Sequence, residues 1–293
     1  MKATTKLKQL VASDSLVVAM GAHDGITAKL VDASAFSAVY VGGHALAATY
    51  GFPDVGLTTV TEVIQRAEVI VDAVEKPVVI DADTGFGGIL NARRTIRAAE
   101  KAGVAGFHVE DQTFPKKCGS YTGISLVPPK EMVAKLQSIL DARVDDDFMV
   151  IARTDAVGAE GTERAIERAQ LYASTGADAV MVMGAKGFSP DQMEKFAKSV
   201  EVPVVWIWAE TEHWVRKQPI LNLKEVQELG FAMCVAPLAL LYAAAKAVQD
   251  VLREIEQSGT SEHVLDRMLD FDTVGQIVNL PEAYEIEDRF DFR

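Results

Sequence analysis

Cysteine is nearly absent from this sequence, and so are long apolar runs. The 293 residues include two cysteines, Cys118 and Cys234, which give no basis for a disulfide framework. No run reaches the roughly 18 apolar residues that a membrane helix needs, so no membrane span is expected. The basic first residues lack the apolar stretch of a secretory signal, and we therefore expect a cytoplasmic protein.

Positive charge is also in short supply. The chain has 29 Lys and Arg residues against 42 Asp and Glu residues, which gives a net charge of −13. Nucleic acids and anionic membranes need a basic surface, so neither is expected as a partner. A small anionic substrate is not excluded, because it responds to the local site and to any bound metal.

The glycine-rich motifs of nucleotide-binding proteins are missing as well. No G-x-G-x-x-G follows the first apolar run, residues 85–88 (Gly-Phe-Gly-Gly) lack that spacing, and there is no P-loop. Their absence argues against a doubly wound open sheet, the fold that commonly carries the first of these motifs.

The sequence does contain a regular alternation of short apolar runs and amphipathic segments. The runs are continuous, which is typical of parallel strands buried on both faces. We predict strands at residues 16–20, 38–41, 78–82, 106–109, 148–152, 179–183, 204–207 and 233–236. We predict helices at 59–75, 92–102, 129–142, 162–175, 190–199, 223–229 and 237–257. About eight strand-then-helix units favour a (β/α)8 TIM-type barrel.

The end of the chain exceeds what a barrel needs. We expect one barrel domain over residues 1–293, of which 238–293 form a C-terminal helical region. Apolar residues in this region, such as Phe271, need a surface on which to be buried. A neighbouring subunit or the base of the same barrel could provide it, and the residues alone leave both open.

Charged side chains, most of them acidic, lie at the ends of several of the predicted strands. In a barrel of this kind the chemistry lies at the carboxyl ends of the strands. Asp81 and Asp83 follow the third strand, Glu110 the fourth, and Arg153 the fifth. Single acids at such positions often cap the next helix, but several together repel one another unless a cation neutralises them. Oxygen ligands suit Mg²⁺, with Mn²⁺ as a possible substitute, and Arg153 would offer its planar fork to a substrate carboxylate.

One cysteine lies in a segment rich in lysine and glycine. Cys118 follows Lys117 and precedes Gly119, and neighbouring cations lower the pKa of a thiol. Such a loop could carry the thiol onto a bound substrate, although a surface loop with a chance cysteine and two solvated lysines is the alternative. His44 could contact a substrate, whereas His108 reads as a core histidine.

Four segments identify a resemblance: residues 81–87 (DADTGFG), 110–112 (EDQ), 116–119 (KKCG) and 151–155 (IARTD). In this order they resemble the isocitrate lyase and phosphoenolpyruvate mutase superfamily. The likeness is greatest to the branch that contains 2-methylisocitrate lyases, 2,3-dimethylmalate lyases and carboxyphosphonoenolpyruvate mutases, and it covers nearly the whole chain.

The resemblance implies an enzyme that is a homotetramer, in which paired subunits exchange the eighth helix. It implies Mg²⁺ held chiefly through Asp83, with Asp54, Asp81 and Glu110 acting mostly through water. It also implies a mobile gate that includes Lys117 and Cys118 and closes over the substrate. The residues expected to contact the substrate are Gly42, Gly43, His44, Asp54, Gly119, Ser120, Met183, Trp206 and Glu210.

The implied reaction is the cleavage of the C2–C3 bond of a 2-hydroxy acid, which yields an α-keto acid such as pyruvate and a carboxylic acid. Cys118 would protonate the carbanion as general acid, with Lys117 and Arg153 as further catalytic residues. Phosphonate-processing relatives commonly lack the cysteine, so its presence argues for carbon–carbon chemistry.

The sequence departs from the lyase pattern at several positions. Ser120 stands where the lyases have histidine, Met183 where they have glutamate, Ile207 near their asparagine, and Gly42 where they have serine. Each change replaces a polar group by a smaller or less polar one. We therefore expect a pocket that fits a 2-alkyl- or 2,3-dialkylmalate better than the tricarboxylate methylisocitrate.

Other readings remain. An oxaloacetate decarboxylase or hydrolase of the same superfamily is one, although Pro237 replaces the serine typical of the hydrolases. A phosphonate enzyme that acts on a P–C bond is another. A non-catalytic binding or assembly protein is the most remote, because the acidic residues, Cys118 and Arg153 are intact.

Overall fold

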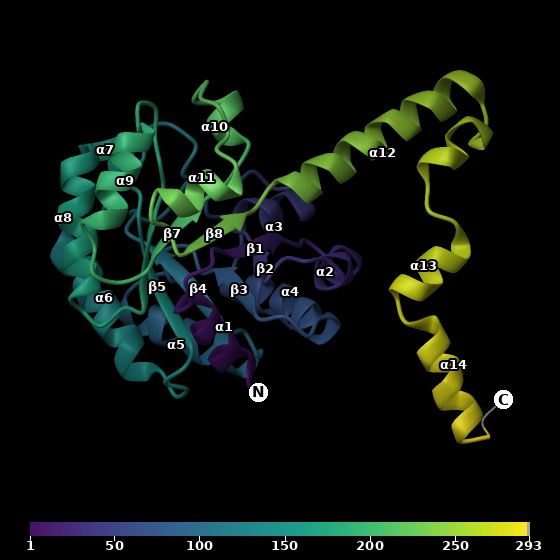
Figure 1. The fold of residues 1–293 in the computed structure, drawn as a ribbon, viewed down its shortest axis with the longest axis horizontal. Coiled ribbons are helices and arrows are strands. Elements are labelled where there is room, and N and C mark those ends of the chain that lie inside the picture. Colours follow the sequence, from purple (N-terminus) through teal and green to yellow (C-terminus); the bar gives the residue numbers. More distant parts are fainter. Residues whose placement is uncertain (292–293) are drawn as a thin grey trace.

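Eight parallel strands, each hydrogen-bonded to the next, close into a barrel in the computed structural model, which describes residues 1–291 (Figure 1). Closure is made where β1 pairs with β8, with Val17 opposite Met233. The strands are β1 (Val17–Gly21), β2 (Ala38–Val41), β3 (Val78–Asp81), β4 (Gly106–Glu110), β5 (Met149–Thr154), β6 (Ala179–Val182), β7 (Val204–Ile207) and β8 (Met233–Ala236). The predicted barrel is confirmed, and the open sheet is excluded.

The predicted strands differ from the observed ones only at their ends. β2, β7 and β8 have the predicted bounds, and the others shift by one or two residues. The largest difference lies at the carboxyl end of β5, which extends two residues beyond its prediction. β4 extends by one residue, so that Glu110 and Arg153 pair in register. An apolar run stops before such polar residues, but the backbone pairing continues through them.

Most of the helices surround the barrel, and those at the end of the chain extend away from it (Figure 1). The helices are α1 (Ala3–Val11), α2 (Gly25–Asp32), α3 (Gly43–Thr49), α4 (Val60–Ala73), α5 (Ile89–Lys101), α6 (Pro129–Ala142), α7 (Ala156–Glu160), α8 (Thr162–Ala173), α9 (Pro190–Lys198), α10 (Thr211–Trp214), α11 (Leu223–Glu228), α12 (Ala239–Ser258), the 3-10 helix η1 (Glu262–Arg267), α13 (Phe271–Ile277) and α14 (Leu280–Arg289). The side chain of Thr59 accepts a hydrogen bond from the Glu62 amide, which fixes the start of α4.

Alternate residues of each strand face opposite sides of the barrel wall. On β7, Val205 and Ile207 belong to the core inside the barrel, whereas Trp206 packs between the barrel and its helices. Tyr40 of β2 belongs to the inner core. This two-sided burial explains why the strands read as continuous apolar runs.

The C-terminal arm, residues 239–291, leaves the barrel at α12 (Figure 1). None of the residues in α12, α13 or α14 is buried, and Leu252 and Phe271 are 56% and 85% exposed. The arm returns to the barrel where α13 contacts α2. The predicted region 238–293 corresponds to this arm, except that its last two residues lie outside the described part of the chain.

None of the described helices combines the length and apolar character that a bilayer crossing requires.

Candidate active site

A cavity of about 200 Å³ opens at the carboxyl ends of the strands. Most of the predicted substrate-contacting residues line it: Gly42, Gly43, His44, Asp54, Gly119, Ser120 and Met183. Asp81, Cys118 and Arg153 line it as well. These residues come from six separate parts of the sequence (residues 42–44, 54, 81, 118–120, 153 and 183), and the barrel brings them to one place.

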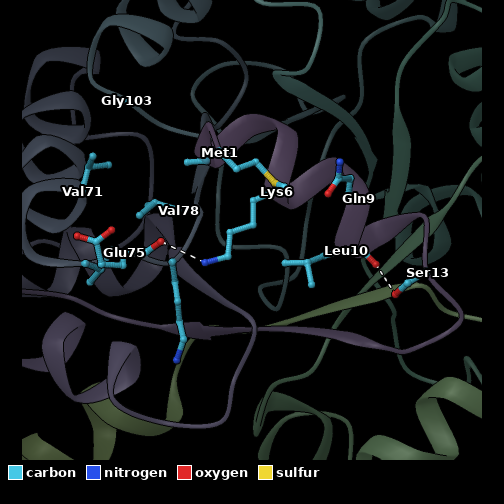
Figure 2. Close-up of a pocket in the computed structure, with 12 residues that line it drawn as sticks. Met1, Lys6, Gln9, Leu10, Ser13, Val71, Glu75, Val78 and Gly103 are labelled. Carbon is cyan, nitrogen blue, oxygen red and sulfur yellow. Dashed lines mark hydrogen bonds between the residues drawn. The ribbon is translucent and has the colours of Figure 1, made fainter.

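A larger hollow of about 680 Å³ lies at the opposite end of the barrel, between α1 and the end of α4 (Figure 2). Val78, the first residue of β3, marks that end. Lys6 reaches across the hollow and donates a hydrogen bond of 3.3 Å to the carbonyl of Glu75. Glu75 is the one acidic residue among the twelve that line it. This hollow therefore lacks a constellation for catalysis.

Lys116 lies among four buried carboxylates, which we call the acidic cluster: Asp54, Asp81, Asp83 and Glu110. Its ammonium is 2.5 Å from Asp54 Oδ1 and 2.6 Å from Asp83 Oδ1, and its side chain is 3% exposed. Burial alone would lower its pKa, but Asp83, Glu110 and the other carboxylates raise that pKa well above the usual value. The reading of both lysines as solvated was wrong for Lys116, which supplies the cation that the carboxylates need.

Asp83 occupies a strained position directly after β3. Its φ of 47° lies in the left-handed region, which a non-glycine residue rarely adopts. Its amide donates a hydrogen bond of 2.8 Å to Asp81 Oδ1, which holds the two carboxyls in fixed relation. Burial and the charges of Asp81 and Asp54 raise the pKa of Asp83 to about 7, against the opposing pull of Lys116.

Glu110 is the least satisfied acid of the cluster. Both of its carboxylate oxygens are buried and lack a hydrogen-bond partner, although Arg153 Nη2 lies 3.1 Å from Oε2. Burial raises the pKa of Glu110 well above its usual value. A buried carboxylate with unpartnered oxygens is costly, and a divalent cation would remove that cost. The donor set of Asp81, Asp83 and Glu110, which is all oxygen, therefore fits such an ion.

Arg153 is held rigidly at the wall of the cavity. Its Nε and Nη2 donate hydrogen bonds of 2.8 and 2.9 Å to the two oxygens of Asp155, and Nη1 lies 3.8 Å from Asp81. The bidentate pair fixes the plane of the guanidinium. Two of its three nitrogens are thus engaged, and Nη1 is the one best placed to meet a substrate oxygen.

The thiol of Cys118 is protonated rather than activated as a thiolate. Burial raises its pKa, as does Asp54, and this outweighs the backbone hydrogen bond from Ser120 and the charge of Arg153. Lys116 does lower this pKa, as expected of an adjacent lysine, but burial and Asp54 raise it by more. Lys117 is exposed, and its charge is not among the causes of the shift.

Lys117, predicted to be catalytic, is not among the residues that line the cavity. Its side chain is exposed, and its ammonium donates a hydrogen bond of 3.4 Å to the carbonyl of Gly123. Its backbone amide donates to Gln112 Oε1, which anchors the segment. The sequence motif was correct, but the lysine inside the site is Lys116.

Trp206 and Glu210 do not line the cavity either. Trp206 packs against Phe188 and Phe231 behind the barrel wall, so its prediction as a substrate contact was wrong. Ile207 faces the cavity instead. Counting the alternation along β7 would have found it, because neighbouring residues of a strand face opposite sides.

His108 lies beneath the acidic cluster. It is fully buried, as expected of a core histidine, and its Nε2 is hydrogen-bonded to the Tyr40 hydroxyl at 2.7 Å. Its Nδ1 lies 3.6 Å from Asp81 Oδ1. Burial lowers the pKa of His108 to about 4, so the ring is neutral at neutral pH. No sequence motif indicates its contact with Asp81.

Two aromatic residues from outside the strands complete the cavity. Tyr242 lies in the first turn of α12, and its hydroxyl is hydrogen-bonded to His44 Nε2 at 2.7 Å. The ring of Trp214, from α10, stacks on Tyr242 with centroids 5.7 Å apart. No motif marks either residue, because both belong to segments that are remote from the strand-end signatures.

Comparisons with known proteins agree on one superfamily. A family model described as phosphoenolpyruvate phosphomutase matches residues 7–256. The chain is 37% identical to the 2,3-dimethylmalate lyase of Eubacterium barkeri over 99% of each chain. It is also 37% identical to the 2-methylisocitrate lyase of Aeropyrum pernix, over 89% of this chain and 82% of that one. A solved structure of oxaloacetate acetylhydrolase with 3,3-difluorooxalacetate superposes with a TM-score of 0.93 at 27% identity, and covers 100% of this chain and 98% of the other.

Proposed function

The chain belongs to the phosphoenolpyruvate mutase and isocitrate lyase superfamily, and from this we propose how its site acts. It is a carbon–carbon lyase that cleaves a 2-hydroxy acid into an α-keto acid and a carboxylic acid. We propose that the substrate is a 2-alkyl- or 2,3-dialkylmalate and that the keto product is pyruvate or a close homologue. The identity to two lyases over most of the chain supports the reaction class.

The observation that carries the proposal is the position of a protonated thiol on the same cavity as the acidic cluster. Cys118, Asp81 and Arg153 all line that cavity. When the C2–C3 bond breaks, the 2-hydroxyl gives its proton to a carboxylate on the cavity, such as Asp81, and becomes a keto oxygen, while the electron pair of the bond stays on C3. The Cys118 thiol then gives its proton to C3, as a general acid must.

Enzymes of this superfamily use a divalent metal ion. We propose that this chain holds Mg²⁺ through Asp83, with Asp81, Glu110 and Asp54 around it, because all four offer oxygen and Mg²⁺ keeps several waters. The ion would supply Lewis-acid polarisation of the substrate's oxygens. Lys116, which lies between Asp54 and Asp83, would balance the same charges when the ion is absent.

Two glycines let the substrate approach the backbone closely. A Cβ on Gly43 would lie 2.9 Å from Asp81 Oδ2, and one on Gly119 would lie 2.7 Å from Arg153 Nη2. Both contacts are shorter than a carbon atom can tolerate. We propose that the amide of Gly119, together with Ser120 and Arg153, binds the substrate's carboxylate oxygens, whereas the amide of Gly43 donates to Asp81 Oδ2 at 3.2 Å.

The remaining wall of the cavity is apolar and accounts for the proposed alkyl groups. Met183, Ile207, Trp214 and Leu238 line it. Its volume of about 200 Å³ is below the range of about 300–1,000 Å³ typical of sites for drug-sized ligands. A small dicarboxylic acid with methyl or ethyl substituents suits such a space, whereas a third carboxylate would have to be buried against this apolar wall.

A coupled assay of α-keto acid release with Mg²⁺ tests the proposed reaction. The panel contains 2,3-dimethylmalate, 2-alkylmalates, 2-methylisocitrate, oxaloacetate and phosphonopyruvate. We expect an alkylmalate to have the highest kcat/KM, at least about tenfold above methylisocitrate, since one buried unpaired charge costs more than 1.4 kcal/mol. Full-rate cleavage of methylisocitrate would refute the apolar-pocket argument.

Oxaloacetate hydrolysis is the second candidate, because a solved structure of an oxaloacetate acetylhydrolase superposes on this chain with a TM-score of 0.93. The side chain of Pro237 lines the cavity and offers no hydroxyl, which weighs against it. If oxaloacetate were the only substrate cleaved in the assay, the enzyme would be an oxaloacetate hydrolase and the proposed malate-type substrate would be wrong.

We propose that the enzyme is a homotetramer whose paired subunits exchange the C-terminal arm. The exposed apolar residues of the arm support this, because Leu252, Met268 and Phe271 lack a covering surface in the isolated chain. Soluble proteins rarely leave such a set of side chains in water. Light scattering should then give a mass about four times the 31.7 kDa of one chain.

Charged substitutions in the arm should break the assembly. We expect the double variant Leu252→Glu, Phe271→Glu to elute as a smaller species in size-exclusion chromatography with light scattering, because two charges would enter an apolar interface. Leu90→Glu is the matched control, since Leu90 is 80% exposed on α5 of the barrel. An unchanged mass for the arm variant would contradict the proposal.

A further inference from the structure

A second cluster of possible metal ligands lies beside the acidic cluster. His44, Asp54 and Cys118 each offer one ligand atom, and these atoms all lie within 4.8 Å of one another. In the part of the chain that the structure describes, no other group of three His, Cys, Asp or Glu side chains was found with this closeness. The three residues come from α3, the loop after it and the cysteine segment, so their convergence is a product of the fold.

The imidazole of His44 is oriented as a ligand. Its Nε2 is hydrogen-bonded to the Tyr242 hydroxyl at 2.7 Å, and its Nδ1 is buried without a hydrogen-bond partner. In metal sites, the nitrogen of a histidine that does not bind the ion is commonly held by an oxygen in this manner. Nδ1 is thus left for a ligand, and leaving it unpaired costs free energy.

The donor types differ from those of the acidic cluster. One thiolate sulphur, one imidazole nitrogen and one carboxylate oxygen match Zn²⁺, whereas Mg²⁺ prefers oxygen alone. Lys116 contacts Asp54 through Oδ1, which leaves the second oxygen of that carboxylate. The two clusters therefore share Asp54, but their other ligands select different ions.

The distances allow a bound ion after a small movement. Zn–ligand bonds of about 2.0–2.3 Å in a tetrahedron place the ligand atoms about 3.3–3.8 Å apart. The three atoms, at up to 4.8 Å, must approach one another by about 1 Å. Cys118 is followed by Gly119 in a segment outside the strands and helices, which can make this adjustment without displacing the barrel.

We propose that His44, Asp54 and Cys118 form a binding site for Zn²⁺ or a similar thiophilic divalent cation, which inhibits the enzyme reversibly. Binding releases the thiol proton to solvent, because the ligand is the thiolate. Cys118 then has no proton to give to a carbanion. The ion also links residues 116–119 to His44 in α3. The inhibition rests on the proposed function of Cys118, whereas the binding does not.

Cobalt titration of the full-length protein, saturated with Mg²⁺, tests the binding directly. Co²⁺ is the probe because a thiolate ligand gives it a charge-transfer band in the near ultraviolet. We expect the band in the wild type, its displacement by Zn²⁺, and its loss in Cys118→Ser. Cys234→Ala is the matched control and should keep the band, because Cys234 is buried in β8.

Two further variants distinguish a three-residue metal site from Co²⁺ binding by the Cys118 thiol alone. His44→Gln should weaken Co²⁺ binding at least about tenfold, and Tyr242→Phe, which keeps every ligand, should weaken it about 10-fold to 100-fold. Unchanged affinity in His44→Gln, a band that survives in Cys118→Ser, or no band at all would each overturn the proposal. Melting curves for every variant verify that it is folded.

The two proposals fail separately. A cobalt band without lyase activity on any substrate would keep the metal site and reject the proposed reaction. Lyase activity without a band would reject the metal site alone. Where both hold, micromolar Zn²⁺ should inhibit the Mg²⁺-saturated enzyme, and a chelator followed by fresh Mg²⁺ should restore the rate.

Discussion

Replacement of Cys118 by serine should lower kcat for the malate-type substrate about 10²-fold to 10⁴-fold, the range that general acid catalysis contributes. A serine hydroxyl has nearly the size of a thiol but is a far weaker acid, so the step that protonates C3 loses its donor. KM should change little, because the side chain still fills the same space. Steady-state release of the α-keto acid gives both parameters.

Cys234→Ala is again the control for this experiment. Cys234 is fully buried in the last strand and its alanine variant should keep kcat, although its stability falls slightly. If Cys118→Ser retained activity within a factor of a few, the thiol would not be the proton donor. The carbanion would then take its proton from water or from another group on the cavity.

Replacement of Lys116 by methionine should destabilise the metal-free protein by about 3–5 kcal/mol, since it removes one partner from a buried ion pair. Four buried carboxylates would be left with Arg153 as their main counter-charge, and protonation of the weaker acids would limit the loss. Added Mg²⁺ should restore much of the stability, because an ion that binds only the folded state stabilises it. Denaturant unfolding with EDTA or with Mg²⁺ measures both effects.

Lys117→Met provides the comparison, because the two lysines are adjacent in sequence but differ in burial. Lys117 is exposed and contacts the carbonyl of Gly123, so its variant should change stability by no more than about 0.5 kcal/mol. Equal effects of the two substitutions would mean that Lys116 does not neutralise the cluster. A larger effect at Lys117 would mean that the exposed lysine, and not the buried one, stabilises this segment.

The barrel was predictable because its signal is repeated. Each strand is an apolar run of four or five residues followed by an amphipathic segment, so an error at one boundary leaves the topology unchanged. The acidic side chains were predictable for a related reason. Parallel strands in a barrel have their carboxyl ends at one face, and Asp81 and Glu110 each end a strand.

The predictions of site residues were wrong where two neighbouring residues had to be told apart. Lys116 and Lys117 have identical side chains, and only the path of the loop decides which of them enters the site. Trp206 and Ile207 could have been distinguished by the alternation along β7. It places Ile207 on the inner face of the barrel wall and Trp206 on the outer face. Trp214 and Tyr242 could not have been found, because their segments carry no motif.

The protonation state of the thiol also lay beyond the sequence. Adjacent lysines predict a lowered pKa for Cys118, and the charge of Lys116 does lower it. Burial of the thiol and the nearby Asp54 carboxylate raise the pKa by more. Local composition therefore predicts the effect of the lysine correctly, but it does not show the burial that outweighs that effect.

Tyr242 belongs to the first turn of the helix that carries the C-terminal arm, and it also forms part of the pocket wall and holds His44. A mutation that changes the direction of α12 would therefore change the shape of the pocket. A mutation of Tyr242 that changes the pocket would in turn affect the first turn of α12. Substrate range and quaternary structure share this residue and cannot drift independently in evolution. Paralogues that change substrate at this point should carry compensating changes along the arm.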